Sequence, residues 1–326
     1  MSVLNTAAAQ GANFHNVLGA VRDVYSAEIY LSALPVMKLD QFTTKKSELG
    51  VQPGMTIQLP KFSNIKRGGP LREGHRIPIQ PMNQTHQPIS VGEYGNGIGF
   101  SEFLLQSSFY DQLAAASILL GRDLAVVLET TLRDAIMQAP SIIRPNDKAS
   151  RALLTAADKI SSDVLKDVIV ALESGNSPRW ENDHYIGFIH PHHGRCLRDD
   201  QYWVNAALYS GLGQVYTGEI GRMEDIRFIV TTIVNNGKDP SIDPITNDRV
   251  DLGFDPDLAV GAGGNQVPIY KSVFFGEYSL GHAVALPVEL RDNHNQDFGR
   301  EHGLAWYSIW GQSVLETKNI VVVETA

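Results

Sequence analysis

The sequence predicts an α+β fold, on three observations. Residues 107–140 place apolar side chains at the spacing of one long amphipathic helix. The C-terminal tail, from residue 303, is rich in aromatic and β-branched residues, which is typical of strands. Helix-like and strand-like segments do not alternate in a regular βαβ order, so we do not expect a regular α/β sheet.

Composition limits the class of protein further. The chain has 326 residues, of which 43% are hydrophobic and 19% are charged, and this is typical of a globular protein with a well-buried core. No purely apolar run approaches the roughly 20 residues of a membrane-spanning helix. The first residues lack the pattern of a signal peptide, so we expect no membrane partner. The single cysteine, Cys196, excludes an internal disulfide and fits a reducing compartment.

The first ninety residues contain little that can form a core. Residues 1–24 are small and polar, and we expect a loosely held arm there. Residues 25–40 have helical spacing, which Pro35 limits. Residues 41–90 are rich in glycine, proline and basic residues, with strand-like alternation over 55–59. A polar excursion of about fifty residues inside a compact domain is unusual. Packing on a partner is favoured over disorder by the scattered large apolar side chains of Phe62, Ile65, Leu71, Ile77 and Ile79.

Charge is distributed unevenly along the chain. Residues 38–76 contain eight Lys and Arg against three acidic residues, a net charge of +5, which leaves −14 on the rest of a chain whose total is −9. The overall acidity argues against a general nucleic-acid-binding protein. A basic segment on an acidic body can bind a nucleic acid, or it can bind another copy of the same body. Binding to another copy explains both the basic segment and the acidic remainder of the chain.

Four glycines, Gly92, Gly95, Gly97 and Gly99, follow the basic segment. Their spacing is not G-x-G-x-x-G and no P-loop lysine follows, so a phosphate-binding loop is not favoured. Glycines within a strand more often mark a bulge or a close approach of two backbones. We therefore interpret this stretch as a strand.

Residues 107–140 give the strongest helix signal. We expect the helix to begin at Ser108, with Asp111 completing a capping box, and to end at Pro140. One face is apolar, and we expect the solvent face to carry Arg122, Glu129 and Arg133. Some thirty residues make a rod of about 45 Å. The apolar spacing does not keep strict heptads, so a structural spine is favoured over a coiled coil.

A second region begins after a polar linker, near residue 151. We expect a helix that starts at Ser161 or Ser162 and ends near Gly175. A buried strand over 184–190 then runs into Pro191, which starts the next helix. Further strands are expected at 226–232, at 266–286 and in the C-terminal tail. The intervening stretch, 235–257, reads as a polar loop whose aspartates lack the spacing of a calcium site.

Three histidines and the only cysteine fall within seven positions: His190, His192, His193 and Cys196. A metal-dependent enzyme that uses this cluster is one alternative function. However, a structural zinc site needs four ligands, a catalytic site needs a further ligand and a base, and a cysteine nucleophile needs a general base and an oxyanion hole. We recognise none of these in the sequence. We interpret the stretch as a tight strand-to-helix corner and predict no catalytic residue, no metal and no cofactor.

The order of these parts resembles the Hong Kong 97-type capsid fold of tailed-phage and herpesvirus major capsid proteins. Local sequence is also similar to the major capsid protein family of N-four-like podophages. The resembling stretches are "GFIHP" with "LRDDQYWVNAALYSG" (197–211), "YTGEIGRMEDIRFIVTT" (216–232) and "LLGRDLAVVLETTLRDA" (119–135). The resemblance implies the following division: N-terminal arm 1–24, start of the P-domain 25–49, E-loop 50–95, P-domain with spine helix 96–150, A-domain 151–285, and C-terminal P-domain strands 286–326.

The resemblance implies a structural function without catalysis. It implies self-assembly into hexamers and pentamers of an icosahedral shell that encloses double-stranded DNA, in a virion assembled in the host cytoplasm. Scaffolding, portal and decoration proteins are the implied partners besides other copies of the chain. A nucleic-acid-binding protein that uses residues 38–76 remains a second alternative. For the shell, we expect E-loop contacts between subunits from Lys61, Phe62, Lys66, Arg67, Leu71 and Arg72.

Overall fold

The computed structural model describes the chain from residue 37 to residue 326, with gaps. The described residues are 37–47, 56–62, 65–70, 73–74, 76–77, 79–108, 112–137, 139–181, 183–200, 219–223, 225–235, 257–260, 266–293 and 300–326. The predicted N-terminal arm, 1–24, and most of the predicted loop at 235–257 therefore lie outside the described residues.

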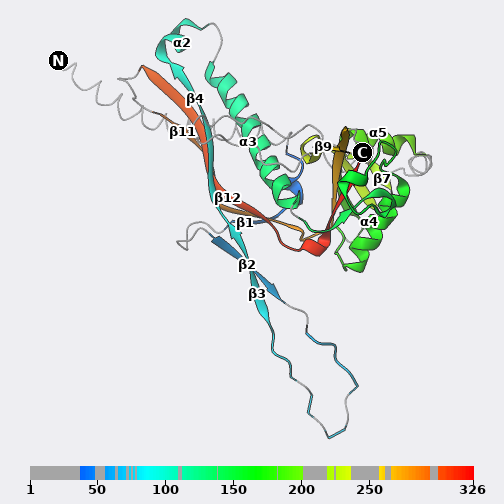
Figure 1. Cartoon of the computed structure of the whole chain (residues 1–326). Helices are drawn as coiled ribbons and strands as arrows, with labels where there is room; N and C mark the ends of the chain where they lie inside the picture. The colour runs from blue at the N-terminus through cyan, green and yellow to red at the C-terminus, as the bar shows by residue number, and fades with distance from the viewer. Residues whose placement is uncertain are drawn as a thin grey trace, which may run out of the picture.

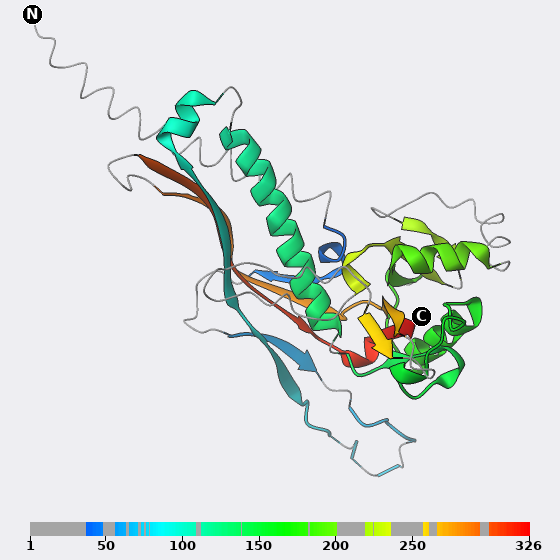
Figure 2. The same cartoon turned by 45° about the horizontal axis from the view of Figure 1, so that its top comes forward.

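Three parts are visible in the molecule (Figure 1). A long sheet lies beside one long helix, α3 (Gln112–Met137), and a rounded lobe lies at one end of that helix. A hairpin made of β2 (Thr56–Phe62) and β3 (Gln84–Ser90) projects away from both. The same arrangement is visible after rotation (Figure 2).

The long sheet has four strands in the order β1-β11-β12-β4. β4 (Gly92–Ser101) and β11 (Leu280–Asp292) flank β12 (Glu301–Val314) in antiparallel pairs, and β1 (Thr44–Ser47) joins β11 in parallel. A short helix, α2 (Glu102–Ser107), continues β4.

Trp306 and Trp310 on β12 fix the helix α3 to this sheet. Both rings are almost fully buried and stack 5.7 Å apart. The Trp306 Nε1–H donates to Asp123 on α3 at 3.0 Å, and the Trp310 ring stacks on Tyr94 of β4. Aromatic burial and one hydrogen bond thus tie the spine helix to two strands.

The lobe contains a second, mixed sheet. Its strands run in the order β5 (Ile142–Ile143), β13 (Ile320–Thr325), β10 (Gln266–Phe275), β6 (Tyr185–Ile189), β8 (Ile226–Val230) and β7 (Glu219–Met223), and β9 (Asp257–Val260) pairs with another part of β10. Two helices, α4 (Ser162–Ser174) and α5 (Pro191–Asp199), complete the lobe. Short 3-10 turns lie at Asp40–Phe42 (η1), Pro145–Asp147 (η2), Arg151–Leu153 (η3), Ile233–Asn235 (η4) and Thr317–Asn319 (η6).

The α+β prediction is confirmed, and so is the spine helix over its described length, Gln112–Met137. Residues 109–111 and 138 lie outside the described residues, so the expected start at Ser108, with its capping box to Asp111, stays a prediction. Ser108 is the C-cap of α2, and its backbone N–H donates to the carbonyl of Leu104. The predicted apolar face is buried: Ala116, Leu120, Leu124, Val127, Leu128 and Ile136.

Two residues assigned to the solvent face of the spine were placed wrongly. Glu129 and Arg133 are both 0% exposed. Arg133 donates to Asp134 and to the carbonyl oxygen of Ile233 at 3.4 Å. Glu129 accepts from backbone N–H groups at residues 38 to 40. Helical periodicity cannot reveal the backbone partners of Glu129 and Arg133, because they lie about 90 to 100 positions away.

Most predictions for the second region are confirmed. Helix α4 begins after Ser161 and ends at Gly175, although Ser161 makes no side-chain capping bond. Strand β6 is buried throughout, and Pro191 is the first residue of α5. Tyr202 and Trp203, in the stretch that follows α5, lie outside the described residues.

The domain division stays a prediction. β13, from the segment assigned to the P-domain, pairs with β10, from the segment assigned to the A-domain, so these two segments share a sheet. Among the helices that the structure describes, none combines the length and the hydropathy required to cross a membrane.

Candidate functional site

The projecting hairpin is the strand part of the predicted E-loop (50–95). β2 and β3 pair from Thr56 opposite Ser90 to Phe62 opposite Gln84. Beyond Phe62 the chain continues without a described strand, and the Gln80 amide joins its two sides. Gln80 accepts from the Lys66 backbone N–H at 2.7 Å and donates to the Lys66 carbonyl oxygen at 3.1 Å. The E-loop thus extends well beyond the body of the subunit (Figures 1 and 2).

Large apolar side chains of the E-loop face solvent. Among the described residues, thirteen large hydrophobic side chains are exposed, and five of them belong to this hairpin. These five are Phe62 (57% exposed), Ile65 (67%), Ile77 (66%), Ile79 (95%) and Met82 (70%). Full burial of one such side chain contributes about 1.5–3 kcal/mol. A row of them on an extended hairpin is typical of a surface that a partner covers.

The root of the E-loop is, in contrast, firmly packed. Ile89 on β3 is 0% exposed. A Cβ built on Gly281 would lie 3.0 Å from the Ile89 side chain, and one built on Gly311 would lie 3.1 Å from it. The hairpin therefore rests on β11 and β12 at one end and is free at the other.

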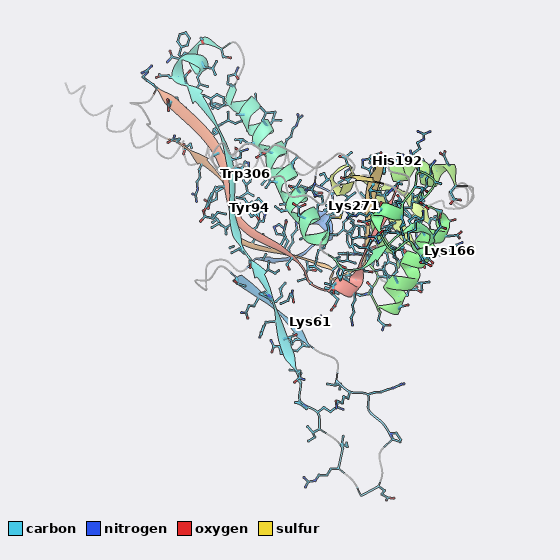
Figure 3. All side chains as sticks on the ribbon, viewed as in Figure 1. Lys61, Tyr94, Lys166, His192, Lys271 and Trp306 are labelled. Carbon is cyan, nitrogen blue, oxygen red and sulfur yellow. The ribbon has the colours of Figure 1, made fainter. Side chains whose placement is uncertain are left out.

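Charged E-loop residues fall into two groups. Lys61 lies on the hairpin (Figure 3). It forms an ion pair with Glu316 of the same chain, so part of its charge is neutralised within the subunit. The side chains of Lys66 and Arg67 are exposed. Leu71 and Arg72 lie outside the described residues. Four of the six predicted contact residues are therefore placed on the hairpin. The list of contact residues omitted Ile65, Ile77 and Ile79, although these side chains already favoured packing on a partner, and Met82 was missed altogether.

The basic segment 38–76 does not present all its cations to solvent. The Lys38 ammonium donates to the carbonyl oxygen of Val230 at 2.7 Å, and Lys45 pairs with Asp40 at 2.5 Å. With the Lys61 pair, three of the eight cations bind groups of the same chain. This lowers the charge available for tracking a nucleic-acid backbone.

The histidine and cysteine cluster forms a packed corner between β6 and α5. The His192 ring stacks on Tyr270 at 4.2 Å, and the His190 ring lies 5.0 Å from the same tyrosine. His190 Nδ1 accepts from the His192 backbone N–H at 3.2 Å, as a helix cap. His193 lies between the hydroxyls of Ser272 and Thr325, each 2.5 Å away.

Burial sets the protonation of these groups. It lowers the pKa of His193 to about 3 and that of His190 to about 4, so both imidazoles are neutral near pH 7. Burial also raises the pKa of the Cys196 thiol, the opposite of what a nucleophile requires. No group of three or more potential metal ligands occurs among the residues whose placement is described. The imidazole nitrogens of His193 are used to join α5 to β10 and β13.

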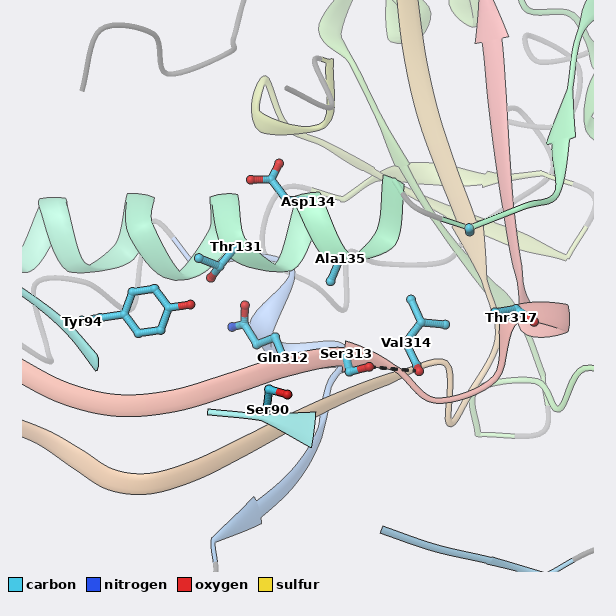
Figure 4. A pocket seen from close by; sticks show the side chains of 10 residues that line it. Ser90, Tyr94, Thr131, Asp134, Ala135, Gln312, Ser313, Val314 and Thr317 are labelled. Carbon is cyan, nitrogen blue, oxygen red and sulfur yellow. Dashed lines mark hydrogen bonds between the residues drawn. The ribbon is translucent and has the colours of Figure 1, made fainter. Parts of the chain in front are cut away.

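A hollow lies between the end of α3 and β12 (Figure 4). It has a volume of about 400 Å³, and Tyr94, Thr131, Gln312 and Ser313 are among its lining residues. Gln312 donates to the carbonyl oxygen of Leu128 at 3.4 Å, across this space. The lining is mainly hydroxyl and amide; its one carboxylate, Asp134, is paired with Arg133.

The predicted close approach of backbones is confirmed for Gly95 and Gly97 of β4, but not for Gly99, where a Cβ would meet nothing within 4 Å. A Cβ on Gly95 would lie 2.9 Å from the carbonyl oxygen of Trp306, and one on Gly97 would lie 3.0 Å from the Cβ of Ala305. These glycines let β4 pack closely against β12.

Comparison with solved structures identifies the fold class. The chain is similar to a capsid chain of the cyanophage P-SCSP1u (TM-score 0.61, 13% identity, 89% of each chain covered). It is also similar to a chain of the cyanophage Pam1 capsid (0.60, 15% identity, 87% of this chain and 88% of that chain) and of the capsid of Ralstonia phage GP4 (0.61, 14% identity, 87% of each). No protein-family model and no curated protein matches the sequence.

The match to the two cyanophage chains covers 89% and 87% of this chain. The chain therefore has the Hong Kong 97-type capsid fold, as the order of its parts predicted.

Proposed function

We propose that this chain is the major capsid protein of a tailed bacteriophage. Copies of the chain build hexamers and pentamers, and these form an icosahedral shell that encloses double-stranded DNA. The observation that carries the proposal is the E-loop, which has a packed root, an extended free end and five exposed large apolar side chains. The likeness to phage capsid chains supports the same function.

Affinity between subunits comes from the apolar side chains of the E-loop. Exposed charge pairs contribute only about 0–1 kcal/mol each, whereas burial of Phe62, Ile65 or Ile79 contributes more. The E-loop lies on the spine helix and lobe of a neighbouring copy, and main-chain bonds along its edges add to the contact. Each subunit makes several such contacts, so weak contacts sum to a stable assembly.

The contact is heterologous, because the E-loop of one copy binds a different surface of the next. Such a contact closes into a ring when the rotation between neighbours fits. The net charge of +5 on residues 38–76 and of −14 elsewhere favours this head-to-tail orientation.

The finer assignment is also part of the proposal. The sequence stretches around "GFIHP" and "GEIGR" support membership of the N-four-like podophage capsid proteins. In that case, scaffolding, portal and decoration proteins are partners of the shell, which forms in the host cytoplasm and becomes part of the virion.

Electron microscopy of the purified full chain, expressed alone and with its candidate scaffolding protein, tests the function. We expect rings or closed shells whose abundance rises with protein concentration. Monodisperse small particles under both conditions would contradict the proposal. Stoichiometric zinc in the purified protein, or DNA binding that falls steeply with salt, would favour the alternative functions instead.

A further inference from the structure

The carboxylate of Glu129 holds three consecutive backbone N–H groups that precede the long sheet. Its Oε1 accepts from Lys38 and from Leu39 at 2.8 Å each and from Asp40 at 3.2 Å. Its Oε2 shares the Leu39 N–H at 3.1 Å. One oxygen therefore makes most of the contact, and the other makes one longer bond.

The segment held in this way, residues 37–42, lies between the spine helix and the lobe. The Lys38 ammonium binds the carbonyl oxygen of Val230, at the end of β8. Phe42 packs edge-on against Trp180, Phe188 and Phe275, with ring centres 5.5 to 6.2 Å apart. Residues 1–36 are joined to the subunit through this segment, so the Glu129 contact is the first described attachment of the chain to its body.

Among the residues that the structure describes, none forms an ion pair with Glu129. It is 0% exposed, and its hydrogen-bond donors are neutral amides. The charged groups around it are engaged elsewhere: Lys38 with Val230, Arg133 with Asp134 and Ile233, and Asp40 with Lys45 and with His282 of β11 at 2.8 Å. A carboxylate in this position is buried without a counter-charge.

Burial is the largest influence on the protonation of Glu129. It raises the pKa of the carboxyl from 4.5 to about 7, although the three amide N–H groups act in the opposite direction, and the charge of Asp40 adds to the rise. When residues 37–42 detach, water reaches the carboxyl, and the free-energy cost of burying its charge disappears. The detached form therefore gains stability from ionisation, relative to the attached form, as the pH rises from 4.5 toward 7.

We propose that Glu129 is a proton-controlled latch that fastens residues 37–42 to the spine helix, closed most firmly when its carboxyl is neutral. The latch belongs to the single subunit and does not depend on shell formation. It makes the attachment of the N-terminal part of the chain sensitive to pH across the range from weakly acidic to neutral.

Hydrogen exchange of the full chain, measured on peptides that cover residues 38–40, tests the latch. In the wild type, we expect the protection factor to fall at least about tenfold between pH 5 and pH 7.5. In Glu129→Gln, the amide oxygen accepts the same bonds without a charge, so protection stays constant over this range. In Glu129→Ala, protection is low at every pH, because the acceptor is lost.

His282 requires its own control, because its ring is an ionisable group in contact with the held segment. Its Nδ1 binds Asp40, and His282→Asn retains a donor there without an ionisable ring. The latch predicts that His282→Asn keeps the pH dependence and that Glu129→Gln removes it. A wild type with pH-independent protection, or a Glu129→Gln variant with the wild-type slope, would overturn the proposal. Unchanged protection of the α3 amides 120–128 confirms that each variant is folded.

Discussion

The carbonyl oxygen of Ser90 lies directly above Gly311, so that a Cβ on residue 311 would be only 2.1 Å from it. This contact joins the last residue of the hairpin strand β3 to the central strand β12. It leaves no room for a side chain, and the obstacle is backbone, which cannot rotate away. The root of the E-loop therefore packs against the long sheet at Gly311, where only glycine fits without a clash.

Gly311→Ala should lower the free energy of unfolding by about 1–3 kcal/mol, because the strands must separate to admit a methyl group. Gly99→Ala is the matched control, since a Cβ there meets nothing within 4 Å, and its effect should stay within about 1 kcal/mol. Urea denaturation of both variants measures the difference. Equal stability of the two would show that the Ser90 contact does not constrain the sheet.

Glu324 joins the linker after the spine helix to the last strand. Its side chain is 1% exposed, and it accepts from Arg144 at 2.8 Å and from Arg151 at 2.7 Å. Glu324→Gln should destabilise the subunit by about 1–3 kcal/mol, because two guanidinium groups lose their counter-charge. Glu289→Gln, in an exposed pair with Arg291 at 3.6 Å, should change stability by less than about 1 kcal/mol. Similar losses in the two variants would contradict this account.

His193 should make the subunit sensitive to acid. Its pKa is lowered from 6.5 to about 3 by burial, so the unfolded chain binds the proton more readily. The stability it confers is complete above pH 6.5 and declines as the pH falls toward 3, by about 1.4 kcal/mol per pH unit. His193→Gln should remove this slope, although it also weakens the bonds to Ser272 and Thr325. Because Glu129 changes the stability with pH in the opposite direction, the wild type and the variant must be compared in the same buffers. If stability falls with acid equally steeply in both, His193 is not the group responsible.

The sequence was sufficient for the features that depend on local patterns. The apolar face of α3, the strand ending before Pro191 and the strand predicted from the alternation at 55–59 follow from spacing and from proline geometry, and all three are present, the last over its described residues from Thr56. Glu129 and Arg133 show where such reasoning fails. A helical projection assigns a charged residue to solvent, because it contains no information about backbone groups some ninety positions away.

The candidate site was predicted in part. The hairpin and its apolar content were visible in the sequence, but the pairing of Lys61 with Glu316 was not, because it depends on how β12 continues past the root of the E-loop. Likewise, the hydroxyl partners of His193 come from β10 and β13, which only the folded sheet brings together.

Reversal of charge on the E-loop should weaken assembly without unfolding the subunit. Lys66 and Arg67 are exposed, so Lys66→Glu with Arg67→Glu should leave stability within about 1 kcal/mol. Repulsion from an acidic neighbour should raise the protein concentration required for assembly by roughly tenfold or more. Light scattering against concentration measures this. Assembly at the wild-type concentration would show that these two charges do not face a partner.

The most direct test removes apolar side chains from the E-loop and counts particles by electron microscopy and sedimentation. The variant is Phe62→Ser with Ile79→Ser, at positions 57% and 95% exposed. The matched control is Phe103→Ser with Leu104→Ser, on α2 and outside the spine helix and the lobe, at positions 81% and 43% exposed. We predict that the E-loop variant stays a folded, unassembled subunit whereas the control forms shells. Shells from the E-loop variant at wild-type yield would contradict the claim that this hairpin holds the assembly together.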